Sequence, residues 1–235
     1  NRCLVGSEMC IRDRYKNSPM SFIGSFGIGM IYGASFGLIA VFGAKLGLSI
    51  FQISILVFVN TFIGALFQYP VGKLSDTFDR RIILLILNII ALVSSICVII
   101  FGSFSFNILL LFVGIHSAVS LPYYAVVISH LNDFLEKDEV VSASSTLTLV
   151  NALGLVLGPI IVSGFMSYFD AYGLFYYCAI VYVFLALFTY QRVRVGRTSE
   201  IYDENTPSMI VPRTTSAIGM QTATEQMISK IDEKE

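Results

Sequence analysis

Long apolar runs separated by short polar or charged segments are the main pattern of this sequence. No Asp, Glu, Lys or Arg occurs from residue 46 to 71 or from residue 82 to 132. Because an α-helix rises about 1.5 Å per residue, about 20 apolar residues cross the hydrocarbon core of a bilayer. The pattern therefore predicts an all-α membrane protein with six transmembrane helices. We expect the spans at residues 20–44, 50–71, 82–101, 106–132, 142–169 and 174–191.

The two ends of the chain do not share this pattern. Residues 1–16 begin without Met, and charges interrupt the apolar core that a signal peptide would need. We interpret them as a non-native leader, which implies that native N-terminal sequence is missing. Residues 17–197 hold the six-helix transmembrane bundle. Residues 198–235 are polar, and we expect a cytoplasmic tail that is mostly disordered.

Composition supports the membrane class and excludes others. Hydrophobic residues make up 55% of the chain and charged residues 13%, whereas a soluble domain has about 25% charged residues. The few charges flank the predicted spans, and no basic stripe indicates nucleic-acid binding. The four Cys and two His residues lack the spacing of a metal site. We therefore predict no nucleic-acid partner, no metal and no cofactor.

Lysine and arginine positions predict the orientation. If the charged segment from Gly72 to Arg81 is cytoplasmic, alternation of the spans puts Lys137 and Arg192 on the same side and Lys45 on the opposite side. Cytoplasmic loops of membrane proteins carry an excess of Lys and Arg. We therefore predict that both termini are cytoplasmic.

Small residues recur every four positions in two spans. They are Gly29, Gly33 and Gly37 in the first span, and Gly154 and Gly158, followed by Pro159, in the fifth. A spacing of four places small residues on one side of a helix, where the backbone of a neighbouring helix can approach closely. We predict close helix packing at these positions and a kink at Pro159.

The charged segment from Gly72 to Arg81 is expected to form a tight loop between the second and third spans. It resembles the loop motif of the major facilitator superfamily, Gly-x-Leu-Ala/Ser-Asp-Arg-x-Gly-Arg-Arg/Lys. The matching residues are Gly72, Leu74, Ser75, Asp76, Arg80 and Arg81. Thr77 replaces the usual Arg, and Asp79 replaces the usual Gly. In the fifth span, Gly158-Pro159 resembles the Gly-Pro kink of the same family.

This resemblance covers about residues 20 to 197 and implies both a fold and a function. A degenerate copy of the loop motif is typical of the second half of such transporters. The chain is thus similar to a C-terminal six-helix half, made of two inverted three-helix repeats, whose N-terminal six-helix half is missing. The implied function is secondary active transport of a small molecule by alternating access. Residues 125–133 resemble YcaD-like bacterial members, which implies a bacterial cytoplasmic (inner) membrane.

Two roles are open for the charged segment. A carboxylate on a loop can sit at the positive N-terminus of another helix, and arginines can bridge to carboxylates. The resemblance implies such a gating role for Gly72, Asp76, Arg80 and Arg81. Alternatively, these charges only set the topology.

His116 is the strongest candidate for the substrate path, because an ionisable group near mid-membrane is by default a functional candidate. Ser120 and Tyr124 share its helix face. The resemblance places the first and fourth spans at the transport cavity, which adds Tyr32 and Ser35. The alternatives are a neutral His116 that is hydrogen-bonded between helices, and packing roles for the others. If protons are coupled to transport, His116 or the missing half carries them.

Two other functions are alternatives to transport by half of a carrier. An intramembrane enzyme using His116, or His130 with Asp133, would need a nucleophile or metal set, and the spans contain no carboxylate. We therefore predict that the protein is not an enzyme. A non-transporting six-helix subunit, or a half-size carrier acting as a dimer, is the alternative to the transporter half. The expected partners are the lipid bilayer, a small-molecule substrate and the missing half.

Overall fold

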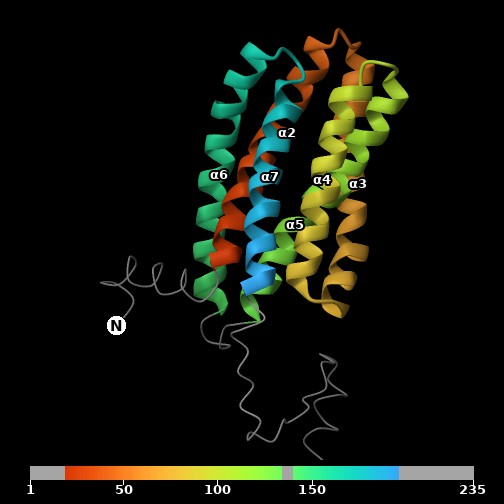
Figure 1. Cartoon of the computed structure of the whole chain (residues 1–235). Coiled ribbons are helices and arrows are strands. Elements are labelled where there is room, and N and C mark those ends of the chain that lie inside the picture. Colours follow the sequence, from red (N-terminus) through yellow and green to blue (C-terminus); the bar gives the residue numbers. More distant parts are fainter. Residues whose placement is uncertain (1–18, 134–139, 196–235) are drawn as a thin grey trace, which may run out of the picture. The chain divides into compact units, whose positions relative to one another are not determined.

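The computed structural model describes residues 19–133 and 140–195, and in them it forms six α-helices and no strand (Figure 1). Each helix is long and apolar enough to cross a membrane. The predicted fold class is therefore confirmed for the described residues, whereas the expected leader and tail lie outside them. The helices are α2 (Pro19–Lys45), α3 (Ile50–Thr77), α4 (Arg80–Phe101), α5 (Phe106–Asn132), α6 (Val140–Tyr168) and α7 (Gly173–Val195).

The expectation of a loop from Gly72 to Arg81 is wrong. Helix α3 continues to Thr77, and only Phe78 and Asp79 separate it from α4. The hydroxyl of Ser75 donates to the carbonyl of Gly72 at 2.9 Å, and that of Thr77 donates to Lys73 at 3.0 Å. These polar side chains thus bond within the helix that carries them. Charges end the stretch that lipid can cover, but they do not end the backbone hydrogen bonding.

Capping residues define where the next helices begin. Ser49 starts α3 with a capping box, in which its hydroxyl accepts from the Gln52 N–H and its own N–H donates to the Gln52 side chain. Asp79 caps α4 by accepting from the backbone N–H of Arg81 at 2.9 Å. Ser105 caps α5. The short connections are therefore encoded by local polar residues between the apolar runs.

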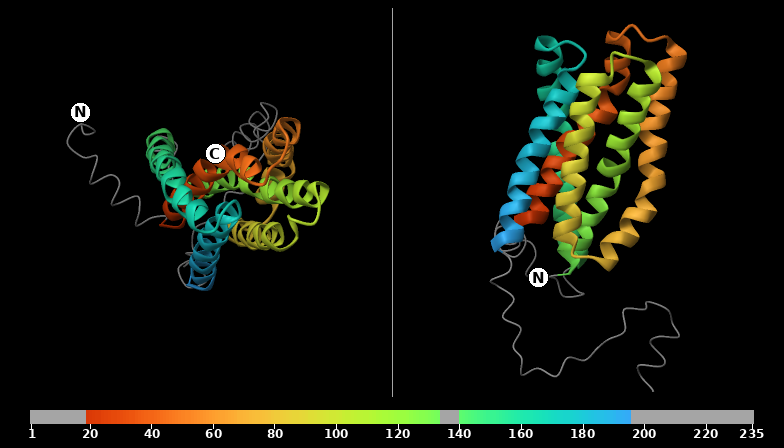
Figure 2. Two further views of the ribbon diagram at one scale, coloured as in Figure 1. Left: turned by 90° about the horizontal axis from the view of Figure 1, so that it is seen from above. Right: turned by 45° about the vertical axis from the view of Figure 1, so that its right-hand side comes forward.

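Helix pairing follows an internal symmetry. Helix α2 packs along α6, α3 packs along α5, and α4 packs against both α5 and α7. Exchanging α2–α4 with α5–α7 maps the α2–α6 pair onto the α5–α3 pair. Each set has three membrane-length helices, so the second set starts on the opposite side of the membrane. The result is a bundle of two inverted three-helix repeats, with α2 and α5 at its centre (Figure 2).

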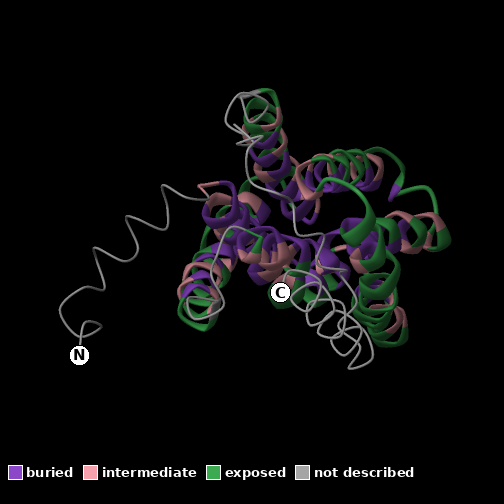
Figure 3. Cartoon of the chain, turned by 90° about the horizontal axis from the view of Figure 1, so that it is seen from below, coloured by how far each residue is buried: buried purple, intermediate pink, exposed green. Residues whose placement is uncertain are grey.

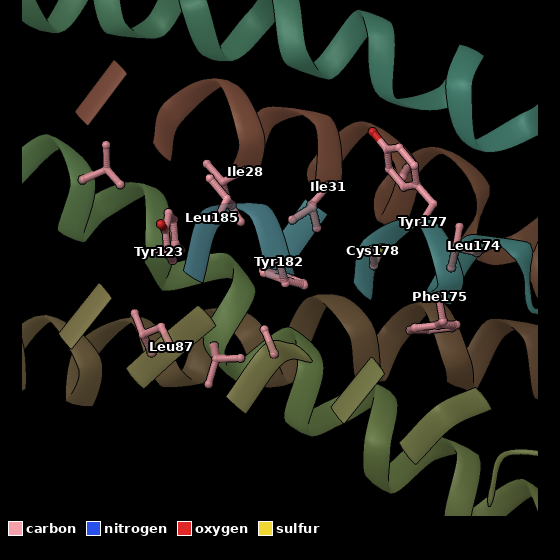
Figure 4. Packing of buried hydrophobic residues seen from close by; sticks show 14 of the residues in the cluster. Ile28, Ile31, Leu87, Tyr123, Leu174, Phe175, Tyr177, Cys178, Tyr182 and Leu185 are labelled. Atoms are coloured by element: carbon pink, nitrogen blue, oxygen red, sulfur yellow. The ribbon is translucent and has the colours of Figure 1, made fainter. Parts of the chain in front are cut away.

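Burial is uneven among the helices. More than half of the membrane-spanning residues of α2 and α5 are buried, but fewer than a quarter of those of α3 and α6. Figure 3 shows buried positions turned inward and exposed positions around the outside. In the core, Ile28 and Ile31 of α2 pack with Tyr182 and Leu185 of α7 (Figure 4). The broad exposed faces of α3 and α6 are apolar.

Candidate functional site

One arginine joins three helix ends at the end of the bundle where α3 meets α4. Arg80 Nη2 lies 3.1 Å from Oδ1 of Asp76, on the last turns of α3. Its Nη1 donates to the Ser129 carbonyl at 2.6 Å and pairs with the carboxylate of Asp133, both at the end of α5. The Arg80 side chain is only 18% exposed. Charge-assisted bonds of this kind are the strong ones, so Arg80 fixes α3, α4 and α5 together.

The other two residues of the predicted gating motif lie beside this cluster. Arg81 follows Arg80 on the first turn of α4, where its N–H donates to Asp79. Gly72 lies one turn before Asp76 on α3, and a methyl group added there would meet no described atom within 4 Å. Close packing within this chain therefore does not require Gly72.

His116 lies inside the bundle, between α5 and α7. Its ring packs edge-on against Phe175 at 5.7 Å and against Tyr182 at 5.6 Å, measured between ring centres. It is 1% exposed, and its Nε2 has no hydrogen-bond partner among the residues that the structure describes. The structure places this side chain among neighbouring aromatic rings rather than at an exposed face, so its predicted place on the substrate path stays a prediction.

Ser120 connects His116 to α7. Its hydroxyl donates to the His116 carbonyl at 2.6 Å, and its oxygen lies 2.6 Å from the Tyr182 hydroxyl. Because a serine has a single hydroxyl proton, Tyr182 is the donor in the second bond. The sequence reasoning missed Tyr182. Its signal was a hydroxyl deep in an apolar span, which needs a partner there.

Tyr32 and Tyr124 are more accessible than His116. Both are partly exposed. The Tyr32 hydroxyl, on α2, lies 2.6 Å from the carbonyl of Leu121 on α5. The Tyr124 hydroxyl, on α5, lies 3.1 Å from that of Thr148 on α6. These two tyrosines thus connect the central helices α2 and α5 to each other and to α6.

Ser35 belongs to a different cluster. Its hydroxyl donates to Oδ1 of Asn60 at 3.3 Å, and the hydroxyl of Ser117 donates to the Asn60 backbone carbonyl. Asn60 lies on α3, so this buried group connects α2, α3 and α5. A second buried amide, Asn88, donates to the Tyr123 and Thr189 hydroxyls at 3.2 and 3.4 Å.

Glycines bring α2 and α6 into backbone contact. A Cβ at Gly29 would lie 2.3 Å from the Asn151 carbonyl oxygen, and one at Gly33 would lie 2.2 Å from that of Leu155. On the opposing helix, a Cβ at Gly154 or Gly158 would come as close to carbonyls of α2. No side chain fits at these four positions without separating the helices.

Pro159 and Gly37, which also belong to the predicted small-residue pattern, differ in how closely they contact the facing helix. We refer to this contact between α2 and α6 as the seam. Pro159 lies inside α6 and packs against the Gly33 position, where its Cδ would be 2.7 Å from an added Cβ. At Gly37 the nearest described atom, Cγ of Pro159, would be 3.6 Å away, which is ordinary contact. The closest approach of the two backbones therefore ends before Gly37.

A lysine at the opposite end of the bundle has a role like that of Arg80. Lys45, the last residue of α2, donates to the Met166 carbonyl at 2.7 Å and lies 3.7 Å from a carboxylate oxygen of Asp170. Asp170, at the α6–α7 connection, has a left-handed backbone with φ of 56°. When the two repeats are exchanged, Lys45 corresponds to Asp133 and Asp170 corresponds to Arg80, so the charges are reversed. The sequence reasoning used Lys45 only as a topology marker.

One apolar groove lies between α2 and α7, with a volume of about 620 Å³. Its lining residues are all apolar: Phe22, Ile23, Phe26, Gly27 and Met30 of α2, and Ile180, Val181 and Phe184 of α7. We refer to it as the α2/α7 groove. In the described part of the chain, no group of three or more His, Cys, Asp or Glu side chains is arranged to hold a metal ion.

Comparisons with known proteins agree with this architecture. Residues 21–220 match the family model of the Major Facilitator Superfamily. The chain is also 28% identical over 172 residues to "Uncharacterized MFS-type transporter YfkF" of Bacillus subtilis (strain 168). That alignment covers 72% of this chain and 43% of the relative, so the chain matches less than half of the relative's length.

Proposed function

This chain belongs to the Major Facilitator Superfamily, and we propose that it is the C-terminal half of a secondary active transporter that carries a small molecule by alternating access. The observation that carries the proposal is the family match, which includes all six described helices. The inverted three-helix repeats and the partial coverage of the Bacillus relative support it. In such carriers, two bundles rock around a site near the midplane of the membrane.

The missing half would pack against α3 and α6. These two helices hold equivalent positions in the two repeats, and both expose broad apolar faces. The clusters at Arg80 and Lys45 would keep each end of this bundle rigid while it moves as a unit. Rigid bodies that pack in two alternative ways are what a rocking mechanism needs.

For the substrate path, we propose that Tyr32 and Tyr124 are the first of the predicted residues to meet substrate. Their partial exposure supports this order. His116 and Ser120 are buried against α7, so substrate would reach them after the two tyrosines. If His116 carries a coupling proton, His116→Gln in the full-length carrier should abolish the pH dependence of uptake.

For location, we propose a bacterial cytoplasmic membrane with both termini on the cytoplasmic side. Arg80, Arg81, Arg192 and Arg194 lie at one end of the bundle and Lys45 lies at the other, which supports this orientation. The similarity of residues 125–133 to YcaD-like members supports a bacterial carrier of that kind.

Uptake by reconstituted vesicles tests the proposal. The full-length gene is recovered from upstream genomic sequence, and a thermal-shift screen of its product against small-molecule classes supplies a candidate substrate. Proteoliposomes with the full-length carrier should accumulate that substrate. Those with residues 17–235 alone should not, because half of the cavity wall is absent.

Two results would contradict this proposal. Accumulation by residues 17–235 alone, together with a native start codon near Met20, would instead favour a half-size carrier that acts as a dimer. No accumulation by residues 17–235, with a start codon near Met20, would favour a non-transporting subunit.

A further inference from the structure

The residues that line the α2/α7 groove have no role in the transport proposal. Ile180 and Phe184, on its α7 side, are each more than half exposed. Phe26 and Met30, on its α2 side, are partly exposed. In a bilayer, an exposed apolar groove between two membrane-spanning helices is in contact with hydrocarbon, so a lipid acyl chain is the occupant that its chemistry fits.

The depth of the groove fits one leaflet. Helix α2 begins and α7 ends at the same end of the bundle (Figure 2). The groove residues on α7 lie about 12 to 18 Å below Arg192, from eight to twelve residues at about 1.5 Å each. Half of the hydrocarbon core is about 15 Å thick. An acyl chain lying in the groove would therefore have its headgroup level with the last turn of α7.

A positive charge is placed at that level. Phe184, Phe188 and Arg192 are four residues apart and follow one row on the surface of α7. The Arg192 guanidinium lies over the Phe188 ring, with its central carbon 5.5 Å from the ring centre. Helical side chains point back toward the N-terminus, which for α7 is toward the groove. Among the ion pairs of the described residues, none involves Arg192.

We propose that the α2/α7 groove binds an anionic phospholipid, with one acyl chain between Phe26 and Phe184 and the phosphate at Arg192. The planar guanidinium is suited to bidentate contact with a phosphate. Arg194 has the same charge about 3 Å further along α7, but it lies over Tyr190, with its central carbon 4.7 Å from that ring centre. Tyr190 is outside the groove lining. Comparing variants of the two arginines therefore distinguishes a specific headgroup contact from general attraction to an anionic surface.

Fluorescence quenching by brominated lipids tests this inference, which does not depend on transport. The chain contains no Trp, so Phe184→Trp gives a single fluorescent side chain in the groove, the groove reporter. The protein is placed in phosphatidylcholine nanodiscs that contain a fixed fraction of a lipid with brominated acyl chains. That lipid is phosphatidylglycerol in one sample and phosphatidylcholine in the other. Ile89→Trp, on the exposed side of α4 at a similar distance from the membrane face, is the reference reporter.

Brominated phosphatidylglycerol should be enriched at the groove reporter about fivefold over brominated phosphatidylcholine, since one basic residue near the surface attracts anionic lipid by about that factor. The reference reporter should show little preference. Adding Arg192→Gln should remove the preference at the groove reporter, and adding Arg194→Gln should leave most of it. Equal losses from the two variants, equal preference at both reporters, or no quenching of the groove reporter by either lipid would each overturn the proposal. The last result would mean that protein covers the groove.

Discussion

At the residue scale, Arg80 is the side chain on which three helix ends depend. Arg80→Ala would leave the Asp133 carboxylate and the Ser129 carbonyl without their charged donor. Breaking a partly buried charge pair from one side costs about 2 kcal/mol or more. We therefore expect the variant to unfold at a lower temperature, or at a lower fraction of SDS, than the parent protein in the same detergent.

Lys73→Ala is the matched control for this variant. It removes the same charge from α3, one turn before that helix ends, but the Lys73 side chain is exposed. Exposed surface charges contribute at most about 1 kcal/mol. Equal losses of stability in the two variants would show that the net charge at this end of the bundle matters, rather than the contacts of Arg80.

For His116, the sequence could predict the depth in the membrane but not the side-chain partners. The depth of His116 followed from counting residues along its span. The direction of its side chain did not, because the apolar and polar residues of α5 are not segregated with the helical period, so the pattern does not tell which face is buried. The partners Phe175 and Tyr182 come from α7, more than fifty residues later in the chain. Only tertiary packing brings them to His116.

At the scale of the element, the seam between α2 and α6 depends on glycine. Gly154→Ala would place a methyl group 2.3 Å from the Phe26 carbonyl oxygen, which is backbone and cannot rotate away. The helices would have to separate, and overpacking of this kind costs about 1–3 kcal/mol. We expect a lower unfolding temperature in detergent for Gly154→Ala.

Gly164→Ala, on the same helix, is the comparison. A methyl group there meets no described atom within 4 Å. Alanine is also the better helix former by up to about 1 kcal/mol. The stability of this variant should be unchanged or slightly higher, and a loss like that of Gly154→Ala would contradict the role of the seam.

The end of α3 is the helix boundary that the pattern predicted least well, six residues too early. The number of helices followed from the apolar runs, because lipid requires an apolar surface and satisfied backbone groups. The end of α3 did not, since hydropathy marks where lipid contact stops and not where the helix stops. The hydroxyls of Ser75 and Thr77 bond to carbonyls of this helix, so these polar residues are accommodated within it. The spacing of four in the glycines did indicate a close approach, although not which helix would approach.

At the scale of the whole molecule, the inverted repeats place one ion pair at each end of the bundle, with the positive and negative residues at exchanged positions. Lys45 with Asp170 closes one end, and Arg80 with Asp133 closes the other. The pairs differ in what surrounds them. Arg81, Arg192 and Arg194 are at the Arg80 end, whereas the Lys45 end has no further Lys or Arg among the described residues. The asymmetry of charge, rather than the fold, is therefore what can orient the bundle.

Cysteine labelling in intact cells tests that orientation. Two single variants are made in a chain whose four Cys residues are replaced by Ser: Ser103→Cys in the α4–α5 connection and Thr77→Cys at the end of α3. Both positions are exposed. Because Lys and Arg are retained in the cytoplasm, we expect a membrane-impermeant maleimide to label the Ser103→Cys variant in intact cells. The Thr77→Cys variant should react only after the membrane is permeabilised. Labelling of Thr77→Cys but not of Ser103→Cys in intact cells would place the arginine-rich end outside and refute the proposed topology.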